Sequence, residues 1–187
     1  MLGLEEMGTT NDLAELLAGL RERGLDYPHH EWIEGGDPTR HVALVSRFPI
    51  TRQYSRTDYT YLLNDASRPI ERGILDVEVQ VNDRYSFRAL VVHLKSKRQS
   101  DIGDQAYMRL EEARLLRSHI GKALKDNPRL NLIAMGDFND MPDSEPLRAI
   151  IGESPFALFD LAPVDSQGTR GTRSEEHTSE LQSRTLI

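Results

Sequence analysis

The sequence predicts a mixed α/β domain in which buried strands are combined with amphipathic helices. Residues 75–81 and 85–91 alternate between apolar and polar side chains around a turn at residues 82–83, a pattern typical of a β-hairpin. Residues 105–126 repeat apolar side chains at helical spacing. Residues 130–135 form a short apolar run that closes at a turn-rich segment, which predicts a buried strand. A chain of 187 residues is long enough for one domain with a sizeable core.

The N-terminal part predicts the stub of a strand followed by a helix. Residues 1–4 are largely apolar, residues 9–11 offer hydroxyl and amide groups for an N-cap, and Gly24 supplies a C-terminal stop. Between the cap and the stop, leucines recur at helical spacing: Leu13, Leu16, Leu17 and Leu20.

The remaining segments are assigned in chain order. Residues 27–30 are expected to be a loop or the entry to a strand, and residues 41–46 a buried strand. Residues 51–70 are polar and mixed, so we expect them to be irregular. The second strand of the hairpin becomes apolar on both faces toward its end, which places that end in the core. Residues 144–151 predict a short helix.

Composition excludes several classes of protein. The net charge of −7 and the pI of about 5.4 argue against a protein that holds nucleic acid mainly by bulk positive charge. An enzyme that meets one phosphate through a metal and a local basic loop stays possible. The absence of cysteine excludes disulfides, thiol nucleophiles and cysteine zinc sites. We find no membrane-spanning stretch and no signal peptide, so we expect a soluble protein whose compartment the sequence does not determine.

The tetrapeptide Gly136-Asp137-Phe138-Asn139 is the most informative motif, because it closes the apolar run of the predicted last strand. Side chains alternate along a strand, so Asp137 and Asn139 are expected to point the same way. Their carboxylate and amide oxygens suit a hard cation such as Mg²⁺ and a phosphate bound to it. A solvated Asp/Asn turn is the structural alternative.

Two further strand ends carry candidate groups. Glu6 follows the first apolar run and could be a metal carboxylate, or an acid that stabilises the dipole of the following helix. His93 ends the second hairpin strand and could act as a general acid or a phosphate partner, because its charge changes near neutral pH. A partly buried histidine bonded to backbone is the alternative for His93.

Basic residues lie beside these strand ends. Lys95, Lys97 and Arg98 follow His93 and could attract phosphate, or could form a solvated basic loop. Arg72 precedes the hairpin and could also reach a phosphate, although most such arginines are surface residues.

Four segments occur in the order found in one known family: residues 4–7, 41–50, 91–96 and 136–140. Over about residues 1–172 the chain resembles the endonuclease/exonuclease/phosphatase superfamily, which has the deoxyribonuclease I-like fold. The resemblance implies an incomplete four-layer sandwich of two mixed β-sheets flanked by helices. It also implies hydrolysis of a phosphoester by water, dependent on Mg²⁺ or Mn²⁺.

The resemblance assigns roles residue by residue. Glu6 matches a metal-binding glutamate. Asp137 and Asn139 match residues that orient the attacking water and hold the metal-bound phosphate, so both are candidate metal and catalytic residues. His93 matches a catalytic histidine near the scissile phosphate. Arg72 fits a substrate-binding arginine less securely, and Lys95 is the substrate-binding candidate of the basic loop.

The resemblance also implies that the chain is truncated at both ends. An upstream strand that carries an asparagine and a terminal Asp-His pair, which includes the general base, are expected to lie outside it. Residues 173–187 resemble the translation of a sequencing adapter, so we expect a partial domain over residues 1–172 and a non-native, disordered tail. We therefore expect little activity and low stability from this polypeptide.

The substrate is left open at this point. A nucleic acid, a phospholipid headgroup and an inositol phosphate all carry the expected phosphoester, and the oligomeric state is undetermined. A non-catalytic binding module of the same fold is the rival interpretation, and a purely structural role for residues 136–139 is a third.

Overall fold

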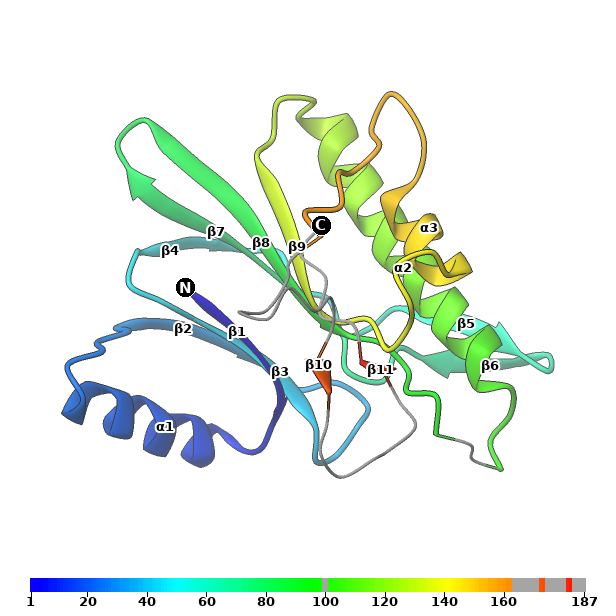
Figure 1. The fold of residues 1–187 in the computed structure, drawn as a ribbon, viewed down its shortest axis with the longest axis horizontal. Coiled ribbons are helices and arrows are strands. Elements are labelled where there is room, and N and C mark those ends of the chain that lie inside the picture. The colour runs from blue at the N-terminus through cyan, green and yellow to red at the C-terminus, as the bar shows by residue number, and fades with distance from the viewer. Residues whose placement is uncertain (99–100, 163–171, 174–180, 183–187) are drawn as a thin grey trace.

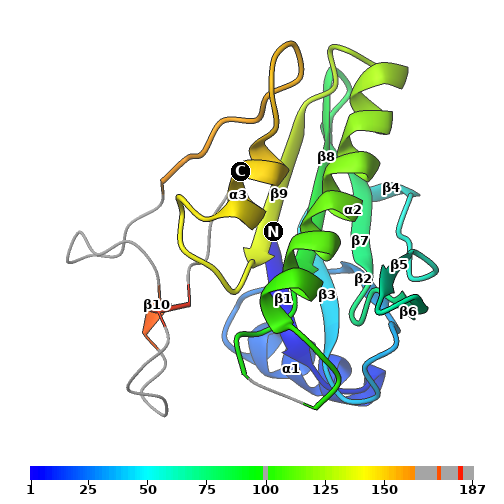
Figure 2. The ribbon, with the colours of Figure 1, turned by 90° about the vertical axis from the view of Figure 1, so that its right-hand side faces the viewer.

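The computed structural model describes residues 1–98, 101–162, 172–173 and 181–182. Its elements form two packed β-sheets with helices on their outer faces, as Figures 1 and 2 show. The first sheet is antiparallel in the order β1-β3-β2. Its strands are β1 (Leu2–Met7), β2 (His29–Ile33) and β3 (His41–Ser46). The second sheet has the order β4-β7-β8-β9 and is antiparallel except for the parallel pair β8-β9. Its strands are β4 (Ile50–Gln53), β7 (Ile74–Asn82), β8 (Tyr85–His93) and β9 (Leu132–Asp137).

Helices cover the two outer faces, which completes four layers. Helix α1 (Thr10–Glu22) lies against the three-stranded sheet, and α2 (Gln105–Asp126) and α3 (Glu145–Ile151) lie against the four-stranded sheet (Figure 1). Thr9 caps α1 through a reciprocal capping box with Asp12, and Asp104 caps α2. The predicted sandwich is therefore confirmed, with mixed strand directions in the larger sheet.

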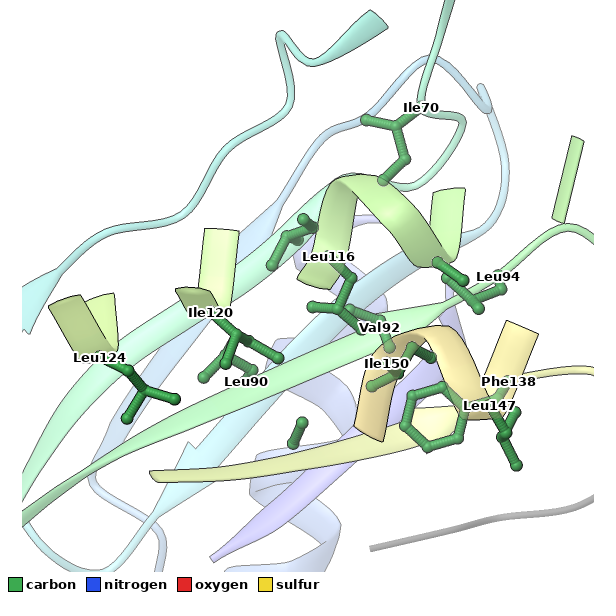
Figure 3. Packing of buried hydrophobic residues seen from close by; sticks show 13 residues of the cluster. Ile70, Leu90, Val92, Leu94, Leu116, Ile120, Leu124, Phe138, Leu147 and Ile150 are labelled. Atoms are coloured by element: carbon green, nitrogen blue, oxygen red, sulfur yellow. The ribbon is translucent and has the colours of Figure 1, made fainter. Parts of the chain in front are cut away.

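Each boundary between layers has its own apolar cluster. Leu13 of α1 packs on Ala43 and Val45 of β3. Alternate residues of β7 and β8, such as Val77 and Val91, meet the first sheet between the two sheets. The largest cluster joins α2 and α3 to the outer face of the four-stranded sheet (Figure 3), and its buried members include Ile70, Leu90, Val92, Leu94, Leu116, Ile120, Phe138, Leu147 and Ile150.

The prediction for residues 51–70 was wrong, because this segment contributes strands. Besides β4, it forms a separate hairpin of β5 (Thr60–Leu63) and β6 (Ala66–Pro69). Every residue of β6 is exposed, so no apolar alternation marks it. The turn at Asn64 and Asp65 has positive φ at both positions, which is the geometry of a two-residue hairpin turn.

The C-terminal expectations fall mostly outside the described residues. Thr172–Arg173 (β10) and Leu181–Gln182 (β11) pair as two short antiparallel strands. The rest of the predicted tail lies outside the described residues, so the division at residue 172 stays a prediction. In the part of the chain that the structure describes, no helix combines the length and apolar character needed to cross a bilayer.

Candidate active site

The ends of β8 and β9 bring the first two candidate side chains together. His93 and Asp137 are partners in the parallel register, and the Leu94 N–H donates to the Asp137 carbonyl at 2.9 Å. Along both strands the preceding alternate residues, Val91 and Met135, face the space between the two sheets. By the period of two, His93 and Asp137 point to that same side, at the end of the inter-sheet core.

Each residue of the motif at 136–139 has a distinct structural role. Gly136 has φ +137°, and a Cβ built there would lie 1.9 Å from the Val92 carbonyl oxygen, so only glycine fits. Phe138 is fully buried against α2 and α3 and anchors the strand end. Asn139 lies beyond the strand with φ +52°, and its N–H donates to Asp137 Oδ1 at 2.8 Å. Asn139 therefore contacts the Asp137 carboxylate through its backbone N–H in this turn, and the strand alternation ends at Asp137.

The Leu94 carbonyl joins the motif to Arg72. It accepts the Asn139 side-chain amide at 2.9 Å and Arg72 Nη1 at 3.4 Å. Arg72 is buried, which excludes the alternative of a surface arginine and leaves its substrate-binding role a prediction. The bond from Asn139 Nδ2 leaves the carboxamide oxygen Oδ1 as the acceptor that Asn139 can offer to a ligand.

Asp37, which the sequence interpretation missed, organises the arginines. Its carboxylate accepts Arg72 Nη2 at 3.2 Å and the backbone N–H groups of Thr39 and Arg40, each at 3.0 Å. Burial opposes ionisation of Asp37, but these N–H donors and the charge of Arg72 outweigh it and lower its pKa to about 2. Asp37 therefore carries a fixed negative charge that holds Arg72 in place.

Glu6 reaches this cluster through Arg40. Its Oε1 lies 3.8 Å from Arg40 Nε, and its side chain is 62% exposed. Glu6 has φ +54° at an irregularity in the pairing of β1 with β3, and such bulges re-aim a side chain. Gly3 of the same strand lies against Val91 and Met135. Strands β1, β8 and β9 run the same way in Figure 1. Because Arg40 pairs with Glu6 and its charge also lowers the pKa of His93, Glu6 lies toward the same end of the sandwich as His93. The alternative role of Glu6, an acid that stabilises the dipole of the following helix, falls to Asp12, which is the acidic residue in the first turn of α1.

His93 is neutral near pH 7 in this environment, so its charge does not change near neutral pH as the sequence interpretation assumed. Burial, then the positive charges of Arg72 and Arg40, lower the pKa of His93 to about 3. Its Nδ1 is buried without a hydrogen-bond partner, and so is Nε of Arg72. Buried polar atoms are normally paired, so two unpaired nitrogens in one cluster suit a ligand that would pair with them.

Lys95 is not a solvated lysine of a basic loop. Its Nζ donates to Glu71 Oε1 at 2.5 Å and its side chain is largely buried. Lys97 pairs with Asp140 at 3.2 Å. The predicted substrate-binding role of Lys95 would require this ion pair with Glu71 to open, so we leave Lys95 out of the proposed set.

Three more residues of the cluster were missed from the sequence: Arg40, Arg109 and Glu112. Arg40 and the turn around Asp37 follow a Gly-Gly pair, and the close approach of Gly35 to the backbone of Glu71 and Arg72 explains the glycine there. That Gly-Gly-Asp-Pro stretch was a signal available for Asp37. Glu112 lay on the polar side of a helix pattern, and nothing in the sequence marks it as buried.

The donor set fits a magnesium ion that keeps most of its waters. Mg²⁺ is usually bound by one or two carboxylates together with waters and substrate phosphates. Glu6, Asp137 and Asn139 offer oxygens of this kind; Asp137 and Asn139 share one turn, and Glu6 is linked to the cluster through Arg40. Among the described residues, no three His, Asp or Glu side chains gather closely enough to hold an ion by themselves.

A hollow elsewhere on the same sheet is not part of this site. It lies at the opposite, starting ends of β8 and β9, and its lining is mainly apolar: Tyr85, Phe87, Asn131, Leu132, Ile133, Leu158, Phe159 and Leu161. None of these residues is a candidate for phosphate chemistry.

Solved structures of similar fold place the chain in a class. SmcL has a TM-score of 0.66 and 18% identity, over 98% of this chain and 68% of its own. Truncated TDP2 from Caenorhabditis elegans has a TM-score of 0.66 and 17% identity, covering 99% of this chain and 68% of its own. Sphingomyelinase C from Streptomyces griseocarneus has a TM-score of 0.56 and 19% identity, covering 80% of this chain and 55% of its own. At these identities the likeness defines a protein of the deoxyribonuclease I-like fold.

The family follows from the sequence itself. The model of the endonuclease/exonuclease/phosphatase family matches residues 1–180, so the chain belongs to that family. The match extends past residue 172, where the resemblance was expected to end. A search of curated protein sequences finds no match.

Proposed function

We propose that this protein is a metal-dependent phosphohydrolase that acts on phosphodiesters. The observation that carries the proposal is the pair of buried, unpartnered nitrogens, Arg72 Nε and His93 Nδ1, beside the Asp137-Asn139 turn. Nitrogen groups that lack a partner in a cluster that is otherwise hydrogen-bonded suit the oxygens of a bound phosphate. Membership of the family supports the reaction class.

Each residue of the candidate site has its own role in the proposed hydrolysis. Arg72, held by Asp37, donates to a phosphoryl oxygen, and neutral His93 offers an N–H to the same group or to the leaving oxygen. Asp137 orients the attacking water, because a carboxylate on a rigid strand end positions it at low entropic cost. Asn139 offers Oδ1 to that water or to the ion, and its second Nδ2 hydrogen to phosphate.

Glu6, Asp137 and Asn139 are the residues proposed to hold Mg²⁺ or Mn²⁺. When bound, the ion supplies positive charge that offsets the charge growing on the phosphoryl oxygens. A similar structure, a variant of Staphylococcus aureus beta toxin, was solved with bound magnesium ions, at 16% identity and a TM-score of 0.56. That likeness supports the choice of metal and leaves the site residues as a proposal.

The test is hydrolysis of bis(p-nitrophenyl) phosphate with Mg²⁺ or Mn²⁺ and with a chelator. Because we expect a low rate, the 187-residue protein is compared with its own Asp137→Asn variant. Metal-dependent hydrolysis that Asp137→Asn lowers by about 10²-fold or more supports the proposal. Equal rates for the two proteins, or a rate that the chelator does not change, would end it.

The substrate class within phosphodiesters is a separate question. Sphingomyelinase C is among the similar structures, so a phospholipid headgroup is one candidate, and nucleic acid and inositol phosphates are the others. The acidic net charge of −7 disfavours tight binding to duplex nucleic acid. Phosphate binding without turnover in the assay above would favour the rival, a non-catalytic binding module.

A further inference from the structure

We propose that Glu112 is a positioning residue: its carboxylate fixes the Leu94-Lys95 peptide and so sets the orientation of Asn139 and Arg72. The catalytic consequence rests on the proposed function. The positioning itself is a property of the folded chain and is measured separately.

Glu112 joins two segments of the candidate site from the side of α2. It lies on α2 and is 1% exposed. Its Oε2 accepts the Lys95 N–H at 2.7 Å, and its Oε1 accepts the Glu71 N–H at 3.3 Å. Both partners are backbone donors, and the two oxygens of the carboxylate satisfy both of them at once. The carboxylate thereby ties the end of β8 to the residue that precedes Arg72.

One peptide group relays this contact into the site. The N–H that Glu112 accepts and the carbonyl of Leu94 belong to the same peptide unit. That carbonyl accepts Asn139 Nδ2 at 2.9 Å and Arg72 Nη1 at 3.4 Å. A hydrogen bond to a carboxylate holds the N–H end firmly and polarises the peptide, which strengthens its carbonyl as an acceptor. Rotation of this peptide would therefore release both side chains together.

Arg109 holds the neighbouring atoms but not the relaying peptide. Its Nη1 donates to the Lys95 carbonyl at 3.3 Å, and its Nε donates to Asp140 at 2.8 Å. Arg109 thus fixes the loop after β8 to the loop after β9. Among the described residues, Glu112 alone accepts the N–H of the peptide that carries the orientation of Asn139.

Because Glu112 is titratable, its two hydrogen bonds to backbone N–H groups are sensitive to pH. Burial raises the pKa of Glu112 to about 7, although the two N–H donors and Arg72 act against the rise. The charged or titratable groups that act on Glu112 are Glu71 and Arg72 before β7 and Tyr61 of β5, beside the backbone N–H groups of Lys95 and Glu71 that it accepts. A protonated carboxyl turns one acceptor into a donor, so one of the two backbone N–H groups loses its partner.

The experiment compares three variants with the wild-type chain. Glu112→Leu removes both acceptors at similar volume. Glu112→Gln keeps one oxygen, which we expect to stay on the shorter bond to Lys95. Glu111→Gln is the matched control, because Glu111 is the neighbouring helix carboxylate and pairs with Arg114. Amide NMR reports the Lys95 and Glu71 N–H groups and the Asn139 side-chain amide, and phosphodiester hydrolysis reports kcat and KM.

We expect Glu112→Leu to lose hydrogen-exchange protection of the Asn139 side-chain amide and about 10²-fold in kcat, with KM changed little. Glu112→Gln should recover most of both, and the Glu111→Gln control should match wild type. If Glu112→Leu does not fold, the wild-type chain is titrated, and the Lys95, Glu71 and Asn139 resonances should shift together near pH 7.

The outcomes separate the two proposals. Absent hydrolysis in wild type, with the NMR changes as expected, rejects the proposed function and retains the positioning. Unchanged Asn139 protection in Glu112→Leu rejects the positioning, and so do wild-type resonances that do not move together between pH 5 and 9.

Discussion

Two buried polar clusters lie on opposite faces of the four-stranded sheet, and they differ in how completely their atoms are paired. The first is the candidate site, on the face toward the other sheet. The second, here called the Asp76 network, lies on the face toward α2 and consists of Tyr59, Asp76, Arg88 and His119. Both combine an arginine, an aspartate and a histidine, so residue type alone does not separate them.

The buried side-chain nitrogen and oxygen atoms of the Asp76 network all have hydrogen-bond partners. Arg88 Nε donates to Asp76 Oδ1 at 2.7 Å, His119 Nε2 lies 2.6 Å from Asp76 Oδ2, and Tyr59 lies 3.0 Å from His119 Nδ1. None of its buried side-chain nitrogen or oxygen atoms lacks a partner, whereas Arg72 Nε and His93 Nδ1 both do. Between these two clusters, pairing rather than burial or charge is therefore what differs, and it marks the candidate site as the one suited to a ligand.

The largest expected effect is on stability, at the Asp76 network. Asp76→Asn leaves Arg88 charged and buried without a counterion, which should lower the free energy of unfolding by about 3–5 kcal/mol. Urea denaturation measures the change. Asp137→Asn, its counterpart at the candidate site, should alter stability far less and hydrolysis far more. The opposite pattern would overturn the comparison.

The next effect is the pH dependence that Glu112 adds. Its pKa is about 7 in the folded chain against an ordinary 4.5, so between these values the folded state holds a proton that the unfolded state releases. Stability should therefore fall as pH rises through this window, by up to about 3 kcal/mol. Denaturation of wild type and Glu112→Gln from pH 4 to 8 tests this, and parallel curves would contradict it.

A smaller effect should come from a ligand. Inorganic phosphate at ten times its dissociation constant should stabilise the chain by about 1.4 kcal/mol if it fills the unpartnered positions of Arg72 and His93. Thermal unfolding with and without phosphate measures the gain. Arg72→Gln should abolish it. A gain that survives in Arg72→Gln would place the anion elsewhere.

The smallest effect is expected at an exposed ion pair. Lys122 and Asp126 pair at 3.0 Å on the surface of α2 with both side chains well exposed. Lys122→Ala should change the free energy of unfolding by at most about 0.5 kcal/mol. The same urea titration reports it, and a loss comparable with that of Asp76→Asn would show that pairing and burial do not rank these contacts.

Local patterns in the sequence predicted the elements whose side chains alternate or recur over many residues. The hairpin at residues 75–91 and the helix at residues 105–126 were found for that reason, and both are present as β7, β8 and α2. The exposed strand β6 was missed, because no face of it is buried and nothing enforces a pattern. Edge strands leave little trace in sequence for this physical reason.

Apart from Arg72, the sequence named candidate site residues at or just beyond the ends of apolar runs. His93 and Asp137 follow β8 and β9, and the register pairs them. Asp37 and Glu112 act through contacts 35 and 17 residues away in the chain, and no local pattern records such contacts. The neutral state of His93 could not be predicted either, since it depends on burial and on the nearby arginines.

Gly136 carries a consequence for anyone who redesigns this protein. The Val92 carbonyl occupies the volume that any side chain at position 136 would need. A mutational library aimed at changing substrate preference should therefore hold this glycine constant and diversify the loops beyond it. Variants with another residue at position 136 would misfold, so their lack of activity in a screen would give no information about catalysis.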